Sequence, residues 1–592
     1  MKFHLALTLP FVLIAVGCSP ESSQITAASE DSNCSDFNEA NNLYWGDLHV
    51  HTAYSMDAYI FGTKASPTDT FNFAKGVTEQ RMPDGTPVKL ERPLDFMAIT
   101  DHAETFGLMH ICTEPDHTGY QTDYCQELRE LSGPNARASI MAFRKLFAPI
   151  SRGKQAPLCS QEDLDCEIAA IDRWNNVQKA ANTADKPCGF TAFLGYEWSA
   201  TPNDAHWHRN IIFKSDVATE GLIDFLRYPT PERMWAELES QCKPENGCDV
   251  LAIPHNTNLS EGGGFDVENS STVELRRRER YERLIEITQH KGTSECLNEN
   301  WDDRNSDCGF EQALSGRMVQ AIRQDPSIRE KYNRSFSRNI LGRGLESYAS
   351  NDEGINPLQI GFIGSTDSHS ATPGLTEEAF WKGDSFGGGD VHRPRWLAGP
   401  GPDFSPGGLV GVWAKQNTRA DIFDGLKSRH AYATSGTRIA LKFAVISSKS
   451  DAKTCGAKLR VGSPMGSTLV TKQTEAPEFV FKATQDLVPL ERVQIVKGSL
   501  KDGQVQEEVL TIKSVDGGFN KACESWSDPN FDPNEPAYWY MRILEVPTPR
   551  WSKLLCKELG NCDKFPNADV MISERAWSSP IWYLPPRTSA EK

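Results

Sequence analysis

The sequence lacks several motifs that would identify its chemistry directly. No G-x-S-x-G motif follows an apolar run, so the nucleophile elbow of a serine hydrolase is not expected. No C-x-x-C pair occurs among the 15 cysteines, which disfavours a thiolate zinc site. The glycine runs at 262–264 and 387–389 lack the strand-turn-helix context of a nucleotide-binding loop, and we interpret them as ordinary loops.

Positive charge is also in short supply. The 62 Lys and Arg residues are outnumbered by 80 Asp and Glu residues, which gives a formal net charge of −18 at pH 7. Nucleic-acid binding requires a basic surface, so we expect no nucleic-acid partner. A small anionic substrate is not excluded, because a site with several divalent cations binds anions whatever the global charge. With 592 residues, 39% of them hydrophobic, the chain is long enough for two or more globular domains.

Only the N-terminus carries an extended apolar run. Residues 1–17 contain a lysine and then a short apolar stretch, which predicts a signal peptide rather than a membrane-spanning helix. The segment Ala15-Val16-Gly17-Cys18 resembles a bacterial lipobox, so a lipid anchor at Cys18 is expected, with simple secretion as the alternative. Residues 18–42 are predicted to be a flexible tether. We therefore expect a bacterial cell-envelope protein, in the periplasm or at the outer membrane, whose only membrane contact is the anchor.

Fourteen cysteines follow Cys18, an even number that favours disulfides in an oxidising compartment. Close spacing suggests five pairs, namely Cys112 with Cys125, Cys159 with Cys166, Cys242 with Cys248, Cys296 with Cys308, and Cys556 with Cys562. Four cysteines have no obvious mate: Cys34, Cys188, Cys455 and Cys523. Their pairing cannot be derived from sequence spacing.

The chain does contain a series of segments rich in histidine and carboxylate that follow apolar runs. They are His49-Val50-His51, Ile99-Thr100-Asp101-His102, Ile253-Pro254-His255-Asn256 and Gly364-Ser365-Thr366-Asp367-Ser368-His369. A single H-x-H is weak evidence, since residues i and i+2 of any strand share a face. Repetition is stronger evidence, because the apolar runs at 94–99, 190–194, 250–253, 284–287 and 360–363 all lead to Asp, Glu or His. Such runs suit parallel strands covered on both faces, whose carboxyl ends gather an active site.

The order of these segments resembles that of the PHP (polymerase and histidinol phosphatase) superfamily. H-x-H is followed by Thr-Asp-His, by the lone glutamate of Gly195-Tyr196-Glu197-Trp198, by Pro-His, and by Thr-Asp-Ser-His. Segments at 208–213, 407–413 and 432–436 resemble a large bacterial branch of that superfamily, and the likeness extends to about residue 585. The resemblance implies an α/β fold, a distorted (β/α)7 barrel with up to three metal ions, and hydrolysis of phosphate esters.

The resemblance also implies ligands for two to three divalent metal ions (Zn, Mn or Fe). His49, His51 and Asp367 would bind the first ion, and Glu197 would bridge it to the second, because a carboxylate screens the repulsion of two close cations. The second ion would add His255 and either His208 or His290. His208 suits the family order but precedes its apolar run, which is the wrong end of a parallel strand, whereas His290 follows its run.

A third ion would be bound by Asp57, His102 and His369. Many members of the superfamily have histidine where this chain has Asp57, and the harder oxygen ligand favours Mn or Fe. Arg209 is the candidate for holding phosphate oxygens, since a guanidinium matches their geometry. Lys291 is interpreted as a solvated charge, and His206 as a surface residue.

The ligand segments define the organisation of the chain. Residues 43–437 are predicted to form the hydrolase barrel, with long polar insertions at about 103–188 and 293–358 that are expected to be helical and to roof the site. Within residues 438–592, strands are predicted at 439–447, 478–484, 492–497, 507–512 and 538–544, separated by turn residues. This region is expected to be a C-terminal β domain.

Together these features predict a secreted or lipid-anchored metal-dependent hydrolase of a small-molecule substrate. The leading expectation is a phosphoesterase in which a hydroxide that bridges two metal ions attacks phosphorus, with catalytic roles for Glu197, Asp367 and Arg209. The same chemistry would serve a carboxylic ester, an amide or a sulfate ester. A further alternative is a non-catalytic surface binding protein on the same fold, because fold does not fix function.

Overall fold

The computed structural model describes residues 33–82, 85–133, 135–161, 163–298, 306–381, 383–384, 397, 404–446 and 452–587. The predicted signal peptide, Cys18 and most of the predicted tether lie outside these residues. Within the described ranges, no helix is both long enough and apolar enough to cross a membrane.

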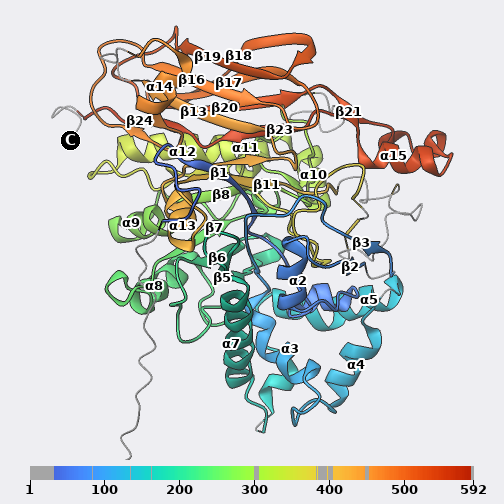
Figure 1. Ribbon diagram of the computed structural model, residues 1–592. Coiled ribbons are helices and arrows are strands. Elements are labelled where there is room, and N and C mark those ends of the chain that lie inside the picture. Colours follow the sequence, from blue (N-terminus) through green and yellow to red (C-terminus); the bar gives the residue numbers. More distant parts are fainter. Residues whose placement is uncertain are drawn as a thin grey trace, which may run out of the picture.

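A mixed central sheet positions most of the ligand segments (Figure 1). Seven of its strands are β1 (Asn42–Asp47), β4 (Phe96–Ala98), β5 (Thr191–Trp198), β6 (Arg209–Phe213), β7 (Val250–Pro254), β11 (Leu409–Ala414) and β12 (Ala431–Thr434). Their order in the sheet is β12-β11-β1-β4-β5-β6-β7. A smaller sheet has the order β10-β8-β9, with β8 (Leu284–Gln289), β9 (Gly292–Thr293) and β10 (Gly361–Gly364). All five apolar runs that predicted strands in this part of the chain are therefore confirmed.

The direction of β6 decides where its ends lie. β1, β4 and β5 run parallel, and β8 runs parallel to β10. β6 is antiparallel to both β5 and β7, and its first residue, Arg209, is opposite Trp198 and Pro254, at the ends of those two strands. The residue that precedes β6 therefore lies at the same edge as the residues that follow β5 and β7. His208 precedes its strand, but because β6 is antiparallel to its neighbours this position lies at the same edge as the other ligand segments.

The α/β class is confirmed, but the described strands do not close into a hydrogen-bonded barrel. β7 packs against β8, and β10 packs against β12, without a ladder between the members of either pair. On its other side β12 pairs antiparallel with β23 (Arg575–Ser578). The central sheet thus continues into C-terminal strands, and the expected distorted (β/α)7 barrel is not confirmed.

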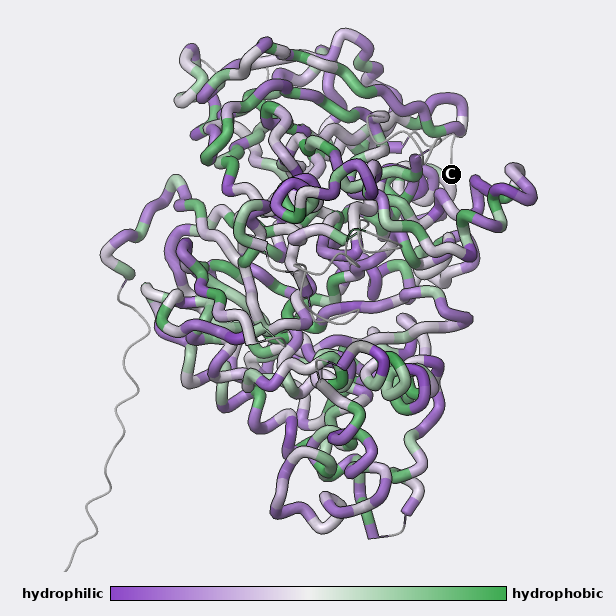
Figure 2. The backbone as a smooth tube through the Cα atoms, turned by 90° about the vertical axis from the view of Figure 1, so that its right-hand side faces the viewer, coloured by the Kyte–Doolittle hydropathy of each residue, from purple (hydrophilic) through white to green (hydrophobic). Residues whose placement is uncertain are grey.

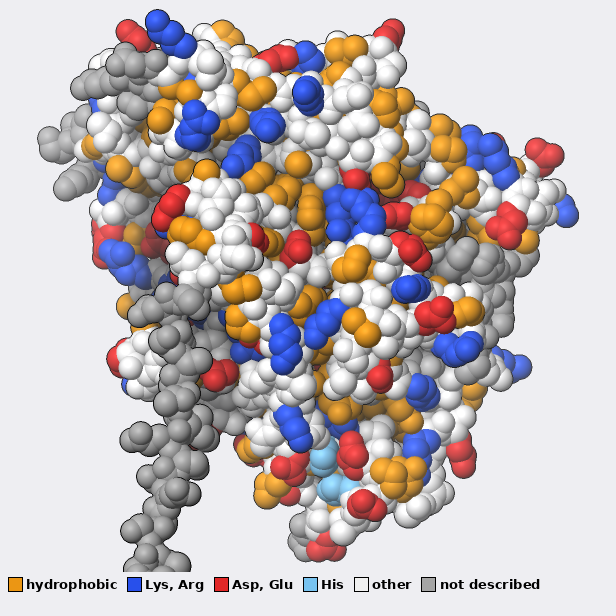
Figure 3. Space-filling model, viewed as in Figure 1, with side chains coloured by type: hydrophobic (Ala, Val, Ile, Leu, Met, Phe, Trp, Pro, Cys, Tyr) orange, Lys and Arg blue, Asp and Glu red, His pale blue; other side chains and the backbone are white. Residues whose placement is uncertain are grey.

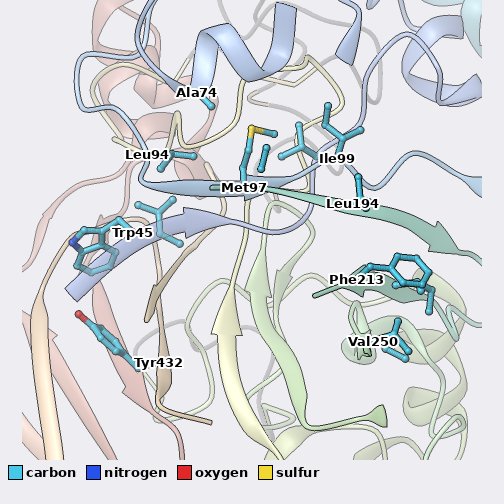
Figure 4. Packing of buried hydrophobic residues seen from close by; sticks show 14 of the residues in the cluster. Trp45, Ala74, Leu94, Met97, Ile99, Leu194, Phe213, Val250 and Tyr432 are labelled. Carbon is cyan, nitrogen blue, oxygen red and sulfur yellow. The ribbon is translucent and has the colours of Figure 1, made fainter. Parts of the chain in front are cut away.

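The central strands are covered on both faces by apolar side chains. In β4 and just after it, Met97 and Ile99 belong to the largest core cluster, whereas Phe96 and Ala98 belong to a separate cluster on the opposite face. This alternation follows from the two-residue period of a strand. Figure 4 shows Met97 on the side of the sheet that faces the helix carrying Ala74. Burial of each large apolar side chain contributes about 1.5–3 kcal/mol, which fixes the strand ends in place.

Helices surround the central strands. The insertion at 103–188 is helical, as predicted, and Figures 1 and 2 show it as a lobe that projects beyond the strands. It contains α3 (Phe106–Thr113), α4 (Asp123–Leu131), α5 (Ala136–Ala142), α6 (Ala148–Ser151) and α7 (Cys166–Ala184). The insertion at 293–358 contributes α10 (Gly316–Gln324), α11 (Arg329–Asn333) and α12 (Ser337–Ser350). The others in this part are α1 (Met56–Ile60), α2 (Pro67–Ala74), α8 (Pro231–Gln241), α9 (Thr272–Tyr281) and α13 (Arg419–Lys427).

The region from residue 438 is rich in strands, and all five predicted strands are present. They are β13 (Ala440–Ile446), β16 (Glu478–Thr484), β17 (Leu490–Lys501), β18 (Gln504–Phe519) and β20 (Ala537–Glu545). They are accompanied by β19 (Lys521–Ser527), β24 (Ile581–Tyr583), α14 (Cys455–Val461) and α15 (Trp551–Glu558). This region also contains the two-residue strands β14 (Ser463–Pro464), β15 (Thr468–Leu469), β21 (Thr548–Pro549) and β22 (Met571–Ile572). The N-terminal part of the chain contains two strands of the same length, β2 (Gln80–Arg81) and β3 (Pro87–Val88).

Seven disulfides connect the fourteen described cysteines. The five pairs suggested by close spacing are confirmed. The remaining two are Cys34 with Cys188 and Cys455 with Cys523, at sequence separations of 154 and 68. This many disulfides indicates a protein that matures in an oxidising compartment.

Charged side chains of both signs are interspersed on the molecular face seen in Figure 3. Among the described side chains of that face, no continuous basic stripe is visible. This arrangement is consistent with the net acidity of the chain, and the absence of a nucleic-acid partner stays a prediction.

Candidate metal centre

The histidines and carboxylates singled out in the sequence meet at one edge of the strands. His49 and His51 follow β1, His102 follows β4, and His255 follows β7. Glu197 lies near the end of β5, and an isolated backbone β-bridge pairs it with His102. All of these side chains are buried. The fold therefore assembles a polar cluster inside the protein from segments that lie far apart in sequence.

The first group consists of His49, His51 and Asp367. The Nε2 atoms of the two histidines are 3.3 Å apart, and Asp367 Oδ1 lies 3.2 and 3.1 Å from them. Donor atoms that bind one tetrahedral zinc ion at 2.0–2.1 Å are separated by about 3.3 Å. Asp367 itself has a left-handed backbone, with φ of 54°, a conformation that aspartate tolerates better than most residues. The spacing of this group matches what a single metal ion requires.

Glu197 extends between this group and a second one. Its Oε2 atom lies 3.6 and 3.4 Å from Nε2 of His49 and His51, and 3.3 Å from Nδ1 of His102, which belongs to the third group. Its Oε1 atom lies 2.7 Å from His208 Nδ1 and 3.1 Å from His255 Nε2. One carboxylate thus faces two pairs of imidazole nitrogens through its two oxygens. This is the arrangement that a bridging ligand between two cations would need.

A third group is centred on Asp57, which comes from α1. Asp57 Oδ2 lies 3.1 Å from His102 Nε2 and 3.0 Å from His369 Nε2. Burial would lower the pKa of His369, but Asp57 outweighs burial and raises it above its ordinary value. A proton on His369 would therefore compete with a cation at this group more strongly than at the other two.

Two oxygen atoms of the cluster are available to a cation. Glu197 Oε2 and Asp367 Oδ1 are buried and make no hydrogen bond, although histidine nitrogens lie near both. A buried carboxylate oxygen without a partner is costly unless a cation or a hydrogen bond compensates it. Four-residue and three-residue sets drawn from the three groups have donor atoms close enough to share an ion. The residues present therefore fit divalent metal ions.

The other ring nitrogens of five of these histidines are held by the protein, whereas His255 Nδ1 makes no hydrogen bond. His49 Nδ1 lies 3.1 Å from both oxygens of Glu286, and His51 Nδ1 lies 2.9 Å from Ser55 Oγ. The remaining contacts of this kind join His102 Nδ1 to Ser199 Oγ at 2.6 Å, His208 Nε2 to Thr201 Oγ1 at 3.0 Å, and His369 Nδ1 to the Asp367 carbonyl at 2.8 Å. Metal-binding histidines ordinarily use their second nitrogen in this way, which fixes the ring orientation.

The electrostatics of the first two groups give the protonation states that metal binding needs. Burial alone would raise the pKa of Glu197, but His102, His255 and His208 outweigh it and hold that pKa well below its ordinary value. Burial lowers the pKa of His51 and of His208 to about 4. Metal ions bind ionised carboxylates and neutral imidazoles, so little proton release is needed at neutral pH.

Comparison with known families places this site in a wider group. The model of one family matches residues 38–522 and 513–585, and that family is described as a protein of unknown function, DUF3604. The chain belongs to the DUF3604 family. No curated protein and no solved structure matched it. The matched segments include every residue of the three groups, so the cluster lies within the DUF3604 region of the chain.

Two buried aspartates hold the ligand loops of this DUF3604 chain, and sequence reasoning assigned neither of them a role. Asp101 accepts hydrogen bonds from the backbone N–H and the hydroxyl of Thr52, at 2.6 and 2.7 Å. Asp47 accepts from the N–H and hydroxyl of Thr366, at 3.1 and 2.6 Å, and from the N–H of Gly374. These contacts fasten the loops that carry the H-x-H, T-D-H and T-D-S-H segments to one another. Asp47 is the last residue of β1, and Asp101 follows β4. This position at the end of an apolar run was the sequence signal that could have identified both residues.

Glu286 and Asp384 are further polar residues that sequence reasoning missed. Glu286 lies inside β8, and an acidic residue within an apolar strand run was the signal that could have identified it. Asp384 accepts the backbone N–H of His369 at 2.8 Å, and its Oδ1 lies 3.9 Å from His290 Nδ1. His290 Nε2 lies 3.3 Å from Asp367 Oδ2, on the side away from the first group. The structure thus places His208 with Glu197, and His290 behind Asp367.

The expectation for Arg209 is wrong. Its guanidinium is 1% exposed, and its Nε donates to Glu282 at 2.9 Å. Its other nitrogens donate to the carbonyls of Trp207 and Gly264 at 2.8 and 2.9 Å. Successive side chains of a strand point to opposite faces, so Arg209 points away from the cluster when His208 points into it. Arg209 is a structural residue.

A pocket of about 130 Å³ opens above the three groups. Beside the metal-ligand candidates it is lined by Phe143, Phe147, Ser151, Ser199, Thr201, His206, Asn256 and Lys291. Lys291 is therefore not simply a solvated charge, because its Nζ contacts Asp367 Oδ2 and its side chain is only 12% exposed. His206 is half-buried beside His208 rather than fully exposed. Of the two insertions, only the one at 103–188 contributes described residues to this pocket.

Proposed function

We propose that this protein is a metal-dependent phosphoesterase of the PHP type. The observation that carries the proposal is Glu197, whose two oxygens face two separate pairs of imidazole nitrogens while Oε2 has no hydrogen bond. The order of ligand segments in the sequence supports the same proposal, since they resemble the PHP pattern and their ends meet at one edge of the strands.

The reaction is hydrolysis of a phosphate ester. The monoester ROPO₃²⁻ and water give the alcohol ROH and hydrogen phosphate: a P–O bond forms to the water oxygen, the ester P–O bond breaks, and one water proton ends on the leaving oxygen. When bound, the divalent metal ions would lower the pKa of water and withdraw charge from the phosphoryl oxygens. Glu197 and Asp367 hold the cluster together, and the small pocket limits the water that reaches the ester.

Lys291 takes the role that Arg209 cannot fill. Among the described residues that line the pocket it is the only Lys or Arg, and its ammonium group lies beside Asp367 at the pocket wall. From there it would hold a non-bridging phosphoryl oxygen, which orients the ester toward the attacking water. A hydrogen bond to a charged group of this kind contributes about 1.5–3 kcal/mol.

The test combines metal analysis with a substrate screen. Protein reloaded with Zn, Mn or Fe after chelation is assayed on p-nitrophenyl phosphate, its bis-ester, p-nitrophenyl sulfate and p-nitrophenyl acetate. The proposal expects bound metal and preferential turnover of a phosphate ester. Bound metal with turnover of only the sulfate or the acetate would replace the phosphoesterase by another metal-dependent hydrolase. Bound metal with no turnover of any substrate would favour a binding protein.

Lys291→Met sharpens the same test. It should keep the metal content and lower kcat/KM for the phosphate ester about 10- to 100-fold. Lys557→Met, at an exposed position on α15, is the matched control and should behave as wild type. Unchanged kinetics in Lys291→Met would remove Lys291 from substrate positioning.

We further propose that Cys18 carries a lipid anchor in the cell envelope. The lipobox-like segment supports this, and the seven disulfides fit an oxidising compartment. Cys18→Ala should release the protein from the membrane fraction or block its processing. Membrane partitioning equal to wild type would contradict the anchor.

A further inference from the structure

One wall of the metal pocket is aromatic and comes from the first insertion. Phe143, Phe147 and Ser151 all line the pocket and are spaced by four residues along a single helical segment. The rings of Phe143 and Phe147 have centroids 5.1 Å apart, and the ring of Phe147 lies 5.5 Å from that of His102. An apolar surface therefore stands directly beside a candidate metal ligand.

The backbone of this wall has an unusual local form. Residues Phe143–Phe147 form a π-helical turn, in which the Ala148 N–H donates to the Phe143 carbonyl five residues earlier. Pro149 follows immediately, and it has no N–H with which to continue the regular α-helical ladder. π-helical turns are rare and occur frequently at functional sites. Both rings line the pocket, and they also pack with Leu146 in the apolar core of the insertion, which holds them in place.

The wall is attached firmly to the metal centre. The helix α1, which carries Asp57, packs against the π-helical turn, and the Gly133 N–H donates to the carbonyl of Ile60 at 2.9 Å. The disulfide between Cys112 and Cys125 connects α3 to α4 in the same lobe. A wall held in this way is preformed, so little ordering entropy opposes ligand binding there.

We propose that Phe143 and Phe147 form a subsite for an apolar, ring-bearing leaving group, so that the substrates are phosphate esters of aromatic or similarly flat apolar alcohols. This inference rests on the proposed phosphoesterase function and specifies its substrate class. Among the described residues, the carboxylates that line the pocket all belong to the three ligand groups, so none is left over to pair with a cationic leaving group. Pockets that enclose a drug-sized ligand measure about 300–1,000 Å³, so this smaller one would hold the phosphoryl group and the adjacent ring only.

The experiment measures binding to the metal-loaded protein by calorimetry, with inorganic phosphate, methylphosphonate, phenylphosphonate and 2-(trimethylammonio)ethylphosphonate as probes. The phosphonates are not hydrolysed, so the readout does not depend on activity. Wild type should bind phenylphosphonate at least about 10-fold more tightly than methylphosphonate, because a filled apolar pocket discriminates by that order. Phenyl phosphate should likewise exceed methyl phosphate in kcat/KM.

Variants locate the effect. Phe147→Ala and Phe143→Ala should each reduce the phenyl-to-methyl affinity ratio to below about 3, while methylphosphonate affinity and metal content stay near wild type. Phe147→Leu keeps an apolar side chain and guards against misfolding, and it should give an intermediate ratio. Phe380→Ala is the matched control, because that ring is 55% exposed and does not line this pocket. Its ratio should equal that of wild type.

The outcomes separate the two proposals. If neither phosphate nor either phosphonate binds to the metal-loaded protein, the phosphoesterase proposal fails and the subsite fails with it. If methylphosphonate and phenylphosphonate bind equally, or if Phe147→Ala and Phe143→Ala keep the wild-type ratio, the subsite is wrong and the anion site stands. Tighter binding of 2-(trimethylammonio)ethylphosphonate than of phenylphosphonate would overturn the apolar specificity in favour of a cationic leaving group.

Discussion

Two of the buried carboxylate-centred clusters among the described residues differ in how their charges are compensated. The candidate metal centre surrounds Glu197, and the second, here called the Glu295 cluster, consists of Glu295, Arg338, Arg542, Tyr540 and Trp577. Glu295 accepts hydrogen bonds from Arg338 Nη2 at 2.9 Å, Arg542 Nη1 at 3.0 Å, Tyr540 at 2.7 Å and Trp577 Nε1 at 2.8 Å. Both of its oxygens are therefore engaged by donors. Glu197, by contrast, has a buried oxygen without any hydrogen bond.

This difference distinguishes a structural cluster from a ligand site. Two permanently charged guanidinium groups neutralise Glu295, and the contacts tie the insertion at 293–358 to strands β20 and β23. Around Glu197 the partners are imidazoles. Burial lowers the pKa of His51 and His208 to about 4. Burial would also lower the pKa of His102, but Glu197 and Asp57 outweigh it and hold that pKa well above its ordinary value. A bound metal ion would compensate the remaining buried negative charge of the cluster. Burial alone therefore does not distinguish a structural carboxylate from a candidate metal ligand; the hydrogen-bond donors around each oxygen do.

The largest expected effect follows from removing the charge of Glu197. Glu197→Gln keeps the side-chain shape but removes the charge and one acceptor, so the first two metal ions should be lost together and kcat should fall at least about 10³-fold. Elemental analysis and steady-state kinetics on the ester that is turned over provide the measurement. His102→Ala should lose mainly the third ion, and Glu295→Gln should keep all of them. Full metal content and near-normal turnover in Glu197→Gln would break the comparison.

The second prediction concerns the free energy of unfolding and applies to the Glu295 cluster. Glu295→Gln removes the buried carboxylate shared by Arg338 and Arg542, which then keep only the more exposed Asp307 and Glu507 as ion-pair partners. Breaking a buried ion pair costs up to about 3–5 kcal/mol. Urea unfolding followed by circular dichroism measures the loss. Glu39→Gln, at an exposed position, is the control and should change the free energy of unfolding by less than about 0.5 kcal/mol. If Glu295→Gln is as stable as wild type, the cluster does not hold the two regions together.

The smallest expected effect is the pH dependence of that stability. Burial would raise the pKa of Glu295, but Arg542 and Arg338 outweigh it and hold the pKa well below its ordinary value. The stabilisation is therefore fully present above the unfolded pKa of about 4.3 and is lost as pH falls toward the folded pKa. The stability difference between wild type and Glu295→Gln should shrink by roughly 1–2 kcal/mol between pH 6 and pH 3. A difference that is constant or grows on acidification would contradict the assigned ionisation.

Much of the metal centre could be predicted because its signals are local in the chain. His49 and His51 share a strand face by spacing alone, and His102, His255 and Asp367 follow apolar runs whose ends were expected to meet. The five short-range disulfides were predictable for a similar reason, since cysteines 6 to 13 residues apart can seldom avoid each other in a compact fold.

Other features depended on which segments became neighbours. The antiparallel direction of β6 places His208 with Glu197 and turns Arg209 away, and neither result can be read from a five-residue apolar run. Glu286 was missed because its partner, His49, is 237 residues away. The distorted barrel was expected by resemblance, and it is not confirmed, because β12 pairs with β23 and extends the sheet.

The sequence by itself determined the residue types of the metal centre, the strand segments that carry them, and the short disulfides, because periodicity, apolar runs and close spacing are properties of the local chain. Only the tertiary structure decided which oxygen of Glu197 lies beside which imidazole, and that Lys291 rather than Arg209 lines the pocket. The same holds for the two disulfides whose cysteines are 154 and 68 residues apart. Those contacts depend on packing between segments that are distant in sequence. The entropy lost in bringing such segments together, and the free energy gained by packing them, are properties of the whole fold rather than of one segment.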